Sequence, residues 1–346
     1  QPNEVFIFNG RINESWTIVC LAEKYKIDYF TYEVANLKNS YYEIHKNKLP
    51  MFYDYNIKFP KKINKLKVLR KKKQVDRFIN KDPIFFNNLS WVNHTISFKK
   101  NHLPKNFNKK LRNICIFNNS LEELDSVRER TLTNPNKSPN DIVFKIIKKF
   151  SKDKNFFFYL RLHPNLIVKN ILTKNITTQF KEIIKRGKNY NNLKIIWPEE
   201  KFDSYELLKN CEKTITFGST IGFEASYIGK PVICINNTKA KVTNYAYFPK
   251  SFNECINLIK KKLKPKPKFG SLYYFYLQLD RGIKMKYCKK NKSGWYFKDK
   301  LIRSDQSLIF MYYIKKIIYL FFTFSLEKLY YKVKNSYLFR RLFVYY

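Results

Sequence analysis

The sequence predicts an α/β fold built on parallel sheets, and three stretches carry that prediction. Residues 211–235, CEKTITFGSTIGFEASYIGKPVICI, have the pattern of a strand, a glycine turn, a short helix and a second strand. Residues 5–32 have the pattern of a strand–helix–strand unit, and strands alternate with helices between residues 156 and 263. Such alternation is typical of a parallel sheet with helices packed on it.

The first unit consists of a strand at residues 5–8, a helix over residues 15–24 and a strand at residues 29–32. Arg11 follows the first strand and Glu33 follows the second. Both would lie at the carboxyl edge of a parallel sheet, where open α/β sheets bind ligands. The alternative is that they are solvated charges or a surface ion pair.

The next stretch is Lys-rich, with helical periodicity over residues 66–78 and a short apolar strand at residues 113–118. Ser120 and Glu123 follow that strand at the spacing of a capping box. Glu123 is therefore either a capping residue or a carboxylate that serves as a general base.

A helix is predicted over residues 141–150 and a strand over residues 156–162. The strand is expected to end at His163 and Pro164. Proline has no backbone N–H to donate to a neighbouring strand, and it restricts the conformation of the residue before it. His163 is thus presented at a carboxyl end, where an imidazole can donate a hydrogen bond to a phosphate oxygen. A structural histidine is the alternative.

The pattern continues with a helix at residues 175–185, a strand at 193–197 and a helix capped by Ser204. The polar run 203–206 would contact a base or ribose, or would only cap this helix. In the stretch 211–235, Gly218 ends the strand, and Ser219 and Thr220 are good N-cap residues for the helix that carries Glu224. A helix N-terminus in that place favours an anion, although a purely structural turn has the same pattern.

Composition excludes some classes of protein. The net charge is +41, but the lysines are spread over the whole chain and no nucleic-acid-binding signature accompanies them, so no nucleic-acid partner is expected. Six scattered cysteines without CxxC spacing indicate reduced thiols and a cytoplasmic protein, and the four histidines do not form a metal-ligand pattern. The chain begins at Gln1, so an N-terminally incomplete first domain is an open alternative.

The C-terminal part differs from the rest. A basic linker at residues 260–268 precedes an aromatic and basic segment, and lysines interrupt the apolar run of residues 305–346. This segment is expected to lie on an anionic membrane surface at the inner face of the plasma membrane, or to pack back onto the domains.

Several motifs carry a resemblance to a known family: RLHPN at 161–165, SYELL at 204–208 and FGSTIGFEASYIGKPVI at 217–233. In this order they resemble the nucleotide-binding half of GT-B glycosyltransferases of bacterial capsule and lipopolysaccharide biosynthesis. FNGR at 8–11 and FNNSLEE at 117–123 are similar to the acceptor-side half. The His-Pro element followed by a Gly turn also resembles CMP-sugar-using sialyl- and Kdo-transferases.

The resemblance implies two Rossmann-like domains that face a cleft. The first would be an acceptor-side domain at residues 1–150, the second a nucleotide-sugar-binding domain at 151–265, and residues 266–346 a basic aromatic helical extension. It also implies a metal-independent enzyme without a cofactor.

Site residues follow from the matched positions. The resemblance implies catalytic roles for Glu123 and His163. The donor-binding residues would be Arg161, Asn165, Ser204, Tyr205, Gly218, Ser219, Thr220, Gly222 and Glu224, and the acceptor-side residues Asn9, Arg11 and Glu33. The sequence departs from the family pattern at Asn118-Asn119, where small hydroxyl residues are usual, and at Val34-Ala35.

The expected function is transfer of a sugar from a nucleotide-sugar donor, with CMP-sugar favoured over UDP-sugar, to a surface-polysaccharide or lipid-linked glycan acceptor. Two alternatives remain at this point. One is a nucleotide-sugar epimerase, and the other is a non-catalytic basic protein that binds nucleic acid or membrane on a transferase-like fold.

Overall fold

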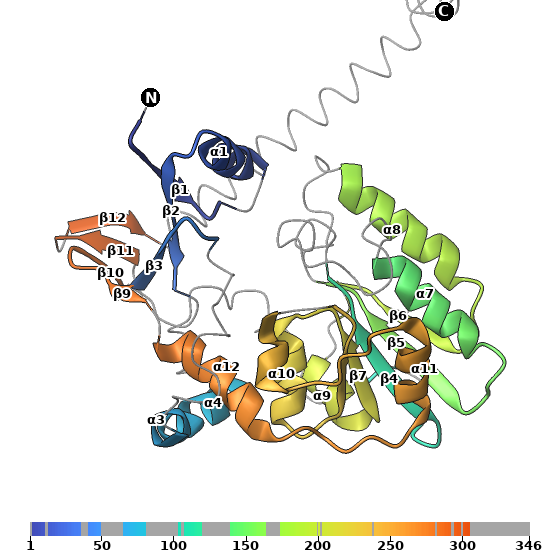
Figure 1. The fold of residues 1–346 in the computed structure, drawn as a ribbon. Helices are drawn as coiled ribbons and strands as arrows, with labels where there is room; N and C mark the ends of the chain where they lie inside the picture. Colours follow the sequence, from blue (N-terminus) through green and yellow to red (C-terminus); the bar gives the residue numbers. More distant parts are fainter. Residues whose placement is uncertain are drawn as a thin grey trace, which may run out of the picture. The chain divides into compact units, whose positions relative to one another are not determined.

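The computed structural model describes residues 2–10, 13–35, 41–49, 65–80, 103–104, 107–119, 139–163, 174–198, 200, 203–236, 239–280, 282–291, 294–298 and 300–304. The chain divides into two compact units, one formed by residues 1–38 and 42–282 and the other by residues 39–41 and 283–346. Figure 1 labels the helices and strands of both.

The N-terminal part of the first unit is a small sheet with one helix. Strands β1 and β2 are parallel, with Phe6 opposite Phe30, and β3 is antiparallel to β2. Ile7, Val19 and Tyr29 are buried between α1 and this sheet. The elements are β1 (Glu4–Phe8), α1 (Asn13–Lys24), β2 (Asp28–Val34) and β3 (Tyr41–Lys46). The expected strand–helix–strand unit is therefore confirmed, and β3 adds an antiparallel strand to it.

A five-stranded parallel sheet with the order β6-β5-β4-β7-β8 forms the larger part of the same unit. Its strands are β4 (Arg112–Phe117), β5 (Phe156–Arg161), β6 (Leu193–Ile196), β7 (Lys213–Thr216) and β8 (Val232–Cys234). Neither face of β4 or β7 is open to water, which explains why their sequences are apolar runs and not alternating patterns.

Helices cover both faces of this sheet (Figure 1). Phe158 and Leu160 of β5 pack with α7, α8 and α11, whereas Tyr159 packs with α3, α4, α9, α10 and α12 on the other face. The helices are α3 (Lys65–Arg70), α4 (Lys72–Ile79), α7 (Pro139–Lys149), α8 (Lys174–Gly187), α9 (Ser204–Asn210), α10 (Thr220–Tyr227), α11 (Phe252–Lys260) and α12 (Lys268–Asp280), with a short 3₁₀ helix, η3 (Lys239–Thr243). The α/β fold class is thus confirmed.

The position of β4 changes the expected domain organisation. β4 pairs with β5 on one side and with β7 on the other, so it is the central strand of the sheet. α7 packs on the same sheet. The sheet therefore begins at Arg112 in the sequence, well before the boundary expected near residue 150.

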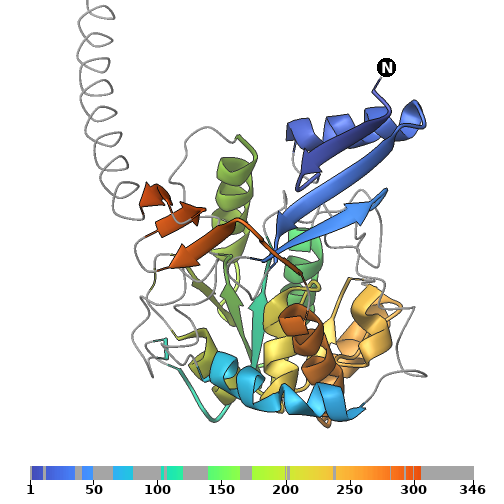
Figure 2. The ribbon, with the colours of Figure 1, turned by 90° about the vertical axis from the view of Figure 1, so that its left-hand side faces the viewer.

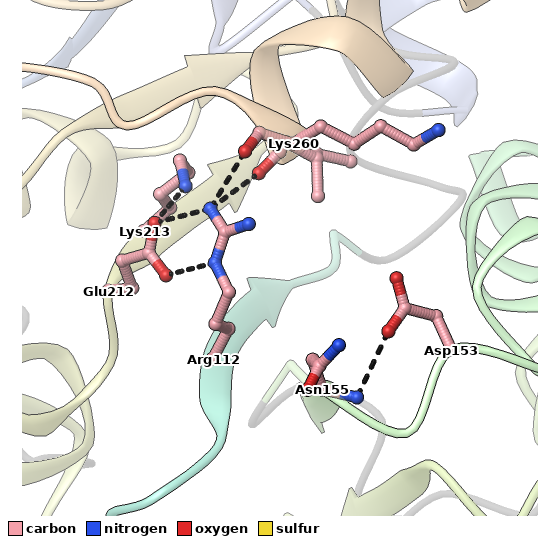
Figure 3. Close-up of polar contacts among 7 residues, drawn as sticks. Arg112, Asp153, Asn155, Glu212, Lys213 and Lys260 are labelled. Atoms are coloured by element: carbon pink, nitrogen blue, oxygen red, sulfur yellow. Dashed lines mark hydrogen bonds and ion pairs between the residues drawn. The ribbon is translucent and has the colours of Figure 1, made fainter.

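An ion-pair network closes the amino edge of the sheet (Figure 3). Arg112 Nε and Nη2 each donate a hydrogen bond of 2.8 Å to the carboxylate of Glu212, and Nη2 also donates to the Lys260 carbonyl at 2.9 Å. The ammonium group of Lys213, whose side chain is fully buried, contacts the same carboxylate. Arg112 is the first residue of β4, Glu212 and Lys213 stand at the start of β7, and Lys260 is the last residue of α11. The network therefore joins these three elements.

The second unit contains short strands: β9 (Ile283–Lys284), β10 (Cys288–Asn291), β11 (Gly294–Phe297) and β12 (Lys300–Ser304). β10, β11 and β12 form an antiparallel sheet. The extension over 266–346 was expected to be helical, but only α12 at its start is a helix among its described residues, and α12 packs on α10 in the first unit. Residues 305–346 lie outside the described residues. None of the described helices is both long enough and apolar enough to cross a membrane.

Candidate functional site

The strand order creates a switch point at the carboxyl edge of the five-stranded sheet. From β4 the chain adds β5 and β6 on one side, and it then returns to add β7 and β8 on the other side. The connections that leave β4 and β7 therefore diverge to opposite faces of the sheet. Open α/β sheets bind ligands in the crevice at such a point, just beyond the strand ends. Here the residues beyond the two strands are Asn118 and the turn 217–219.

Gly218 and Ser219 form the turn between β7 and α10. Gly218 has a φ of +93°, which explains the glycine because other residues are strained there. Ser219 is the N-cap of α10, but its side chain accepts no capping hydrogen bond. Its Oγ is buried without a hydrogen-bond partner among the described residues. A serine hydroxyl and a helix N-terminus in this arrangement suit an anionic group.

Gly222 lies one turn into α10 and packs against the sheet. A Cβ atom at this position would lie 3.0 Å from Thr216 Oγ1 and 3.2 Å from Tyr245 Cε2. The glycine thus lets α10 approach β7 closely. Close packing explains Gly222 without a ligand, although the resemblance implies donor binding for this residue.

Asn118 joins the ends of β4 and β5. Its side chain is 3% exposed, and Oδ1 accepts a hydrogen bond of 2.8 Å from the backbone N–H of His163. Because that N–H can only donate, Oδ1 must be the acceptor, and the amide Nδ2 has no hydrogen-bond partner among the described residues. The structure thus places His163 next to Asn118, with the imidazole half-buried. Asn118 was noted in the sequence only as a departure from the family pattern.

Asn236 takes the corresponding place after β8. It is 1% exposed, and Nδ2 donates a hydrogen bond of 2.8 Å to the Phe217 carbonyl. Its Oδ1 has no hydrogen-bond partner in the part of the chain that the structure describes. Among the residues that the structure describes, the ends of β4, β7 and β8 thus all carry a buried polar atom without a hydrogen-bond partner. Sequence reasoning missed Asn236, although an asparagine directly after a buried strand was a signal for it.

Tyr205 and Glu224 form a pair between α9 and α10. The phenol donates a hydrogen bond of 2.7 Å to Glu224 Oε2, and the Glu224 residue is 7% exposed. Burial raises the pKa of the Tyr205 phenol well above its ordinary value, and the charge of Glu224 raises it further. The phenol therefore stays protonated and keeps its role as the donor. This pair brings together two of the predicted donor-binding residues.

The helix that carries Tyr205 is capped by Asp203. Asp203 Oδ1 accepts a hydrogen bond of 2.9 Å from the backbone N–H of Tyr205, and Ser204 is the first helical residue. Ser204 was expected to cap this helix, but the capping residue is Asp203. A capping carboxylate at this position satisfies a helical N–H that has no partner within the helix.

Two other predicted donor-binding residues have contacts within the protein. Arg161 is 4% exposed, and its guanidinium donates to the carbonyl of Trp197 at the end of β6. Thr220 Oγ1 lies 3.4 Å from the hydroxyl of Tyr274 on α12. The ring of Tyr274 stacks on Phe223 at 3.8 Å, so α12 supports the first turns of α10.

On the acceptor side, the structure brings Asn9 and Glu33 together. Asn9 Nδ2 donates a hydrogen bond of 2.8 Å to Glu33 Oε2, at the carboxyl ends of β1 and β2. Arg11, Glu123 and Asn165 lie outside the described residues. Within the described ranges, no three His, Cys, Asp or Glu side chains form a group that could hold a metal ion.

Comparisons with known proteins give only distant similarities. No family model and no curated protein sequence matches the chain. Among solved structures, the chain is similar to KpsC of Thermosulfurimonas dismutans, a beta Kdo 2,4 transferase, with 13% identity over 78% of each chain and a TM-score of 0.48. It is also similar to the UDP-GlcNAc 2-epimerase of Methanocaldococcus jannaschii, with 14% identity over 80% of this chain and 77% of that one and a TM-score of 0.37. No conclusion about function follows from similarities of this strength.

Proposed function

We propose that this protein is a glycosyltransferase that binds a nucleotide sugar at the carboxyl edge of its five-stranded sheet. The observation that carries the proposal is a set of buried polar atoms at the ends of β4, β7 and β8 that have no hydrogen-bond partner within the described ranges: Asn118 Nδ2, Ser219 Oγ and Asn236 Oδ1. Buried polar atoms are nearly always hydrogen-bonded in folded proteins, so such a group at a switch point is typical of a ligand site. The resemblance of the motifs to GT-B enzymes supports the same function.

In this proposal the N-terminus of α10 holds the phosphate of the donor. Ser219 Oγ and Asn118 Nδ2 would donate hydrogen bonds to phosphate oxygens, and the helix dipole would favour the negative charge. Transfer of the sugar leaves additional charge on the departing phosphate. Donors fixed in place by the fold stabilise that charge more in the transition state than in the ground state, which accelerates the reaction.

Glu224 is one helical turn into α10, and the resemblance assigns it to the ribose of the donor. Its Oε2 accepts from Tyr205, which fixes the orientation of the carboxylate. In this proposal the carboxylate accepts hydrogen bonds from ribose hydroxyls. This arrangement supports a nucleotide ligand over inorganic phosphate alone.

The acceptor side of the proposal rests on the sequence resemblance. Glu123 would take the proton from the acceptor hydroxyl, and Asn9, Arg11 and Glu33 would contact the acceptor. A CMP-sugar is favoured as the donor, and a surface-polysaccharide or lipid-linked glycan as the acceptor.

The test is a thermal-shift screen of the purified chain with CMP, UDP, GDP and dTDP. A bound nucleotide stabilises the folded state by mass action, so the true product nucleotide raises the melting temperature in proportion to its affinity. We expect a shift with one nucleotide that is reduced in His163→Ala and in Glu224→Gln. Absence of a shift with all four nucleotides would contradict the proposal.

A second assay separates transfer from epimerisation. The nucleotide sugar that matches the nucleotide is incubated with and without a glycan acceptor, and the products are analysed by mass spectrometry and NMR. A glycosylated acceptor supports the transferase. A free nucleotide sugar whose configuration changes without any acceptor would instead identify an epimerase.

A further inference from the structure

A basic groove lies on α3, α4 and α12, and its lining residues differ from those that carry the polar atoms at the sheet edge. It is a depression of about 710 Å³, lined by Lys67, Arg70, Lys71, Lys73, Gln74, Arg77 and Tyr276. The lining includes five cationic side chains and no carboxylate. Figure 2 shows α3 and α4 in light blue, and both helices contact α12. The charge of the lining makes an anionic partner the natural occupant.

The sequence of α3 and α4 is itself strongly basic. Residues 65–80 contain seven Lys or Arg side chains and one acidic side chain, Asp76. Asp76 pairs with Lys72 at 2.7 Å and accepts a hydrogen bond of 2.6 Å from the Tyr227 hydroxyl. Basic side chains therefore outnumber acidic ones seven to one over residues 65–80. The hydrogen bond from Tyr227 also joins α4 to α10, one of the helices that pack on the five-stranded sheet.

Exposed leucines accompany the cations. Leu66 is 64% exposed and Leu69 is 49% exposed, whereas Val68 between them is fully buried and holds α3 on the core. Helical spacing places Leu66, Leu69 and the exposed Arg70 on the side of α3 opposite Val68. Leucines do not pair with phosphates, so the phosphate backbone of a nucleic acid would contact the cations and not these two side chains. A bilayer accepts both groups, because cations pair with lipid phosphates and leucines enter the boundary between headgroups and acyl chains.

We propose that the surface formed by Leu66, Leu69 and the basic groove docks this protein on a bilayer of anionic phospholipid. The cations of the groove bind the phosphates of the headgroups, and the two leucines insert beside them. This inference does not depend on the proposed function, because it rests on residues outside the sheet edge. It also differs from membrane binding by residues 305–346, since it assigns the contact to the folded domain.

The test is co-sedimentation of the full chain with vesicles at physiological ionic strength. Two kinds of vesicle are compared: phosphatidylcholine alone, and phosphatidylcholine mixed with phosphatidylglycerol. We expect binding to the mixed vesicles and little binding to the neutral ones. The double variant Arg70→Gln, Lys73→Gln should reduce the partition coefficient on mixed vesicles about 10- to 30-fold, since each cation near the surface contributes comparably. Leu69→Gln should reduce it several-fold.

Matched controls separate the local surface from net charge and from general hydrophobicity. The double variant Lys148→Gln, Lys149→Gln also removes two positive charges, but at exposed positions of α7, on the opposite face of the sheet. Leu21→Gln changes a leucine of α1 that is 47% exposed. Both controls should bind mixed vesicles within about twofold of the wild type, and circular dichroism should show that all variants are folded.

Three results would overturn the proposal. The first is equal binding of the wild type and of Arg70→Gln, Lys73→Gln to mixed vesicles, which would assign the contact to another part of the chain. The second is that the wild type does not bind mixed vesicles. Binding of an oligonucleotide that Arg70→Gln, Lys73→Gln abolishes would then assign the groove to a nucleic acid. The third is displacement from vesicles by millimolar glycerol phosphate, which would identify a site for one small phosphate and not a bilayer-docking surface.

Discussion

The phenol of Tyr205 on α9 and the carboxylate of Glu224 on α10 lie 2.7 Å apart, although 19 residues separate them in the sequence. The two helices flank β7 in the chain, so this hydrogen bond joins the segment before the strand to the segment after it. The pair fixes a buried carboxylate next to the turn 217–219. In the proposed function, this pair would let the site distinguish a nucleotide from a simple phosphate.

Removing the Glu224 charge should weaken nucleotide binding. We expect Glu224→Gln to lower the affinity for the matching nucleotide about tenfold, because hydrogen bonds to a charged acceptor are the stronger ones. Tyr205→Phe should lower it only a few-fold and should decrease the free energy of unfolding by about 1 kcal/mol, because it deletes one buried hydrogen bond. Isothermal titration calorimetry and chemical unfolding measure the two effects. Wild-type affinity in Glu224→Gln would mean that the carboxylate only orients Tyr205.

Two N-cap serines of the same domain give a matched comparison. Ser251 caps α11, and its Oγ accepts a hydrogen bond of 3.2 Å from the Glu254 N–H, whereas Ser219 makes no such bond at the start of α10. Ser251→Ala should therefore decrease the free energy of unfolding by about 1 kcal/mol and leave nucleotide affinity unchanged. Ser219→Ala should lower nucleotide affinity about tenfold with a change in stability of less than about 0.5 kcal/mol.

Chemical unfolding and calorimetry on both serine variants provide the measurements. A loss of stability in Ser219→Ala equal to that in Ser251→Ala, with unchanged affinity, would show that the Ser219 hydroxyl serves the fold and not a ligand.

Asn118→Asp tests the Nδ2 donor without a change in shape. The aspartate keeps an oxygen for the N–H of His163, which lies 2.8 Å from Oδ1, but replaces the amide donor with a second acceptor. We expect nucleotide affinity to fall more than about tenfold, because a carboxylate repels the phosphate. Asn118→Ala, which removes both functions, should also decrease the free energy of unfolding by about 1–3 kcal/mol. Undiminished affinity in Asn118→Asp would exclude a phosphate next to Nδ2.

The network at the amino edge of the sheet predicts a pH dependence of stability. Burial raises the pKa of Glu212, but hydrogen bonds from Arg112 and Lys213 outweigh it and lower the pKa from 4.5 to about 2. A lowered pKa in the folded state means that the carboxylate stabilises the protein above pH 4.5, and that this contribution disappears as the pH falls from 4.5 to 2.

The expected difference in unfolding free energy between wild type and Glu212→Gln is about 1–3 kcal/mol at pH 7, after allowance for solvent screening of the partly exposed carboxylate. It should decrease steadily below pH 4.5. Denaturant unfolding at several pH values measures this difference. The control is Glu206→Gln. It removes an ion pair in which Lys209 Nζ lies 2.9 Å from Glu206 Oε1 and the lysine side chain is exposed to solvent. This variant should change the free energy of unfolding by less than about 1 kcal/mol at any pH. A pH-independent difference for Glu212→Gln would contradict the assignment.

The local sequence determined most of the secondary structure of the larger domain. Apolar runs at 113–118 and 213–217 predicted β4 and β7, and glycine at position 218 predicted the turn that its φ of +93° requires. These features depend on the conformational preferences of a few adjacent residues, so they can be recognised without knowledge of the rest of the chain. Ser219 is likewise the N-cap residue of α10, as its place after the glycine turn predicted.

Only the tertiary structure decided which strands are neighbours and which side chains meet. The order β6-β5-β4-β7-β8 joins β4 to the later strands and makes Arg112 the beginning of the first strand of this sheet. It also creates the switch point and brings Asn118 and Asn236 to the same edge of the sheet. Strand order and pairs such as Tyr205 with Glu224 arise from contacts between distant segments. A periodic pattern fixes the face on which a side chain lies, but not the strand or helix that faces it.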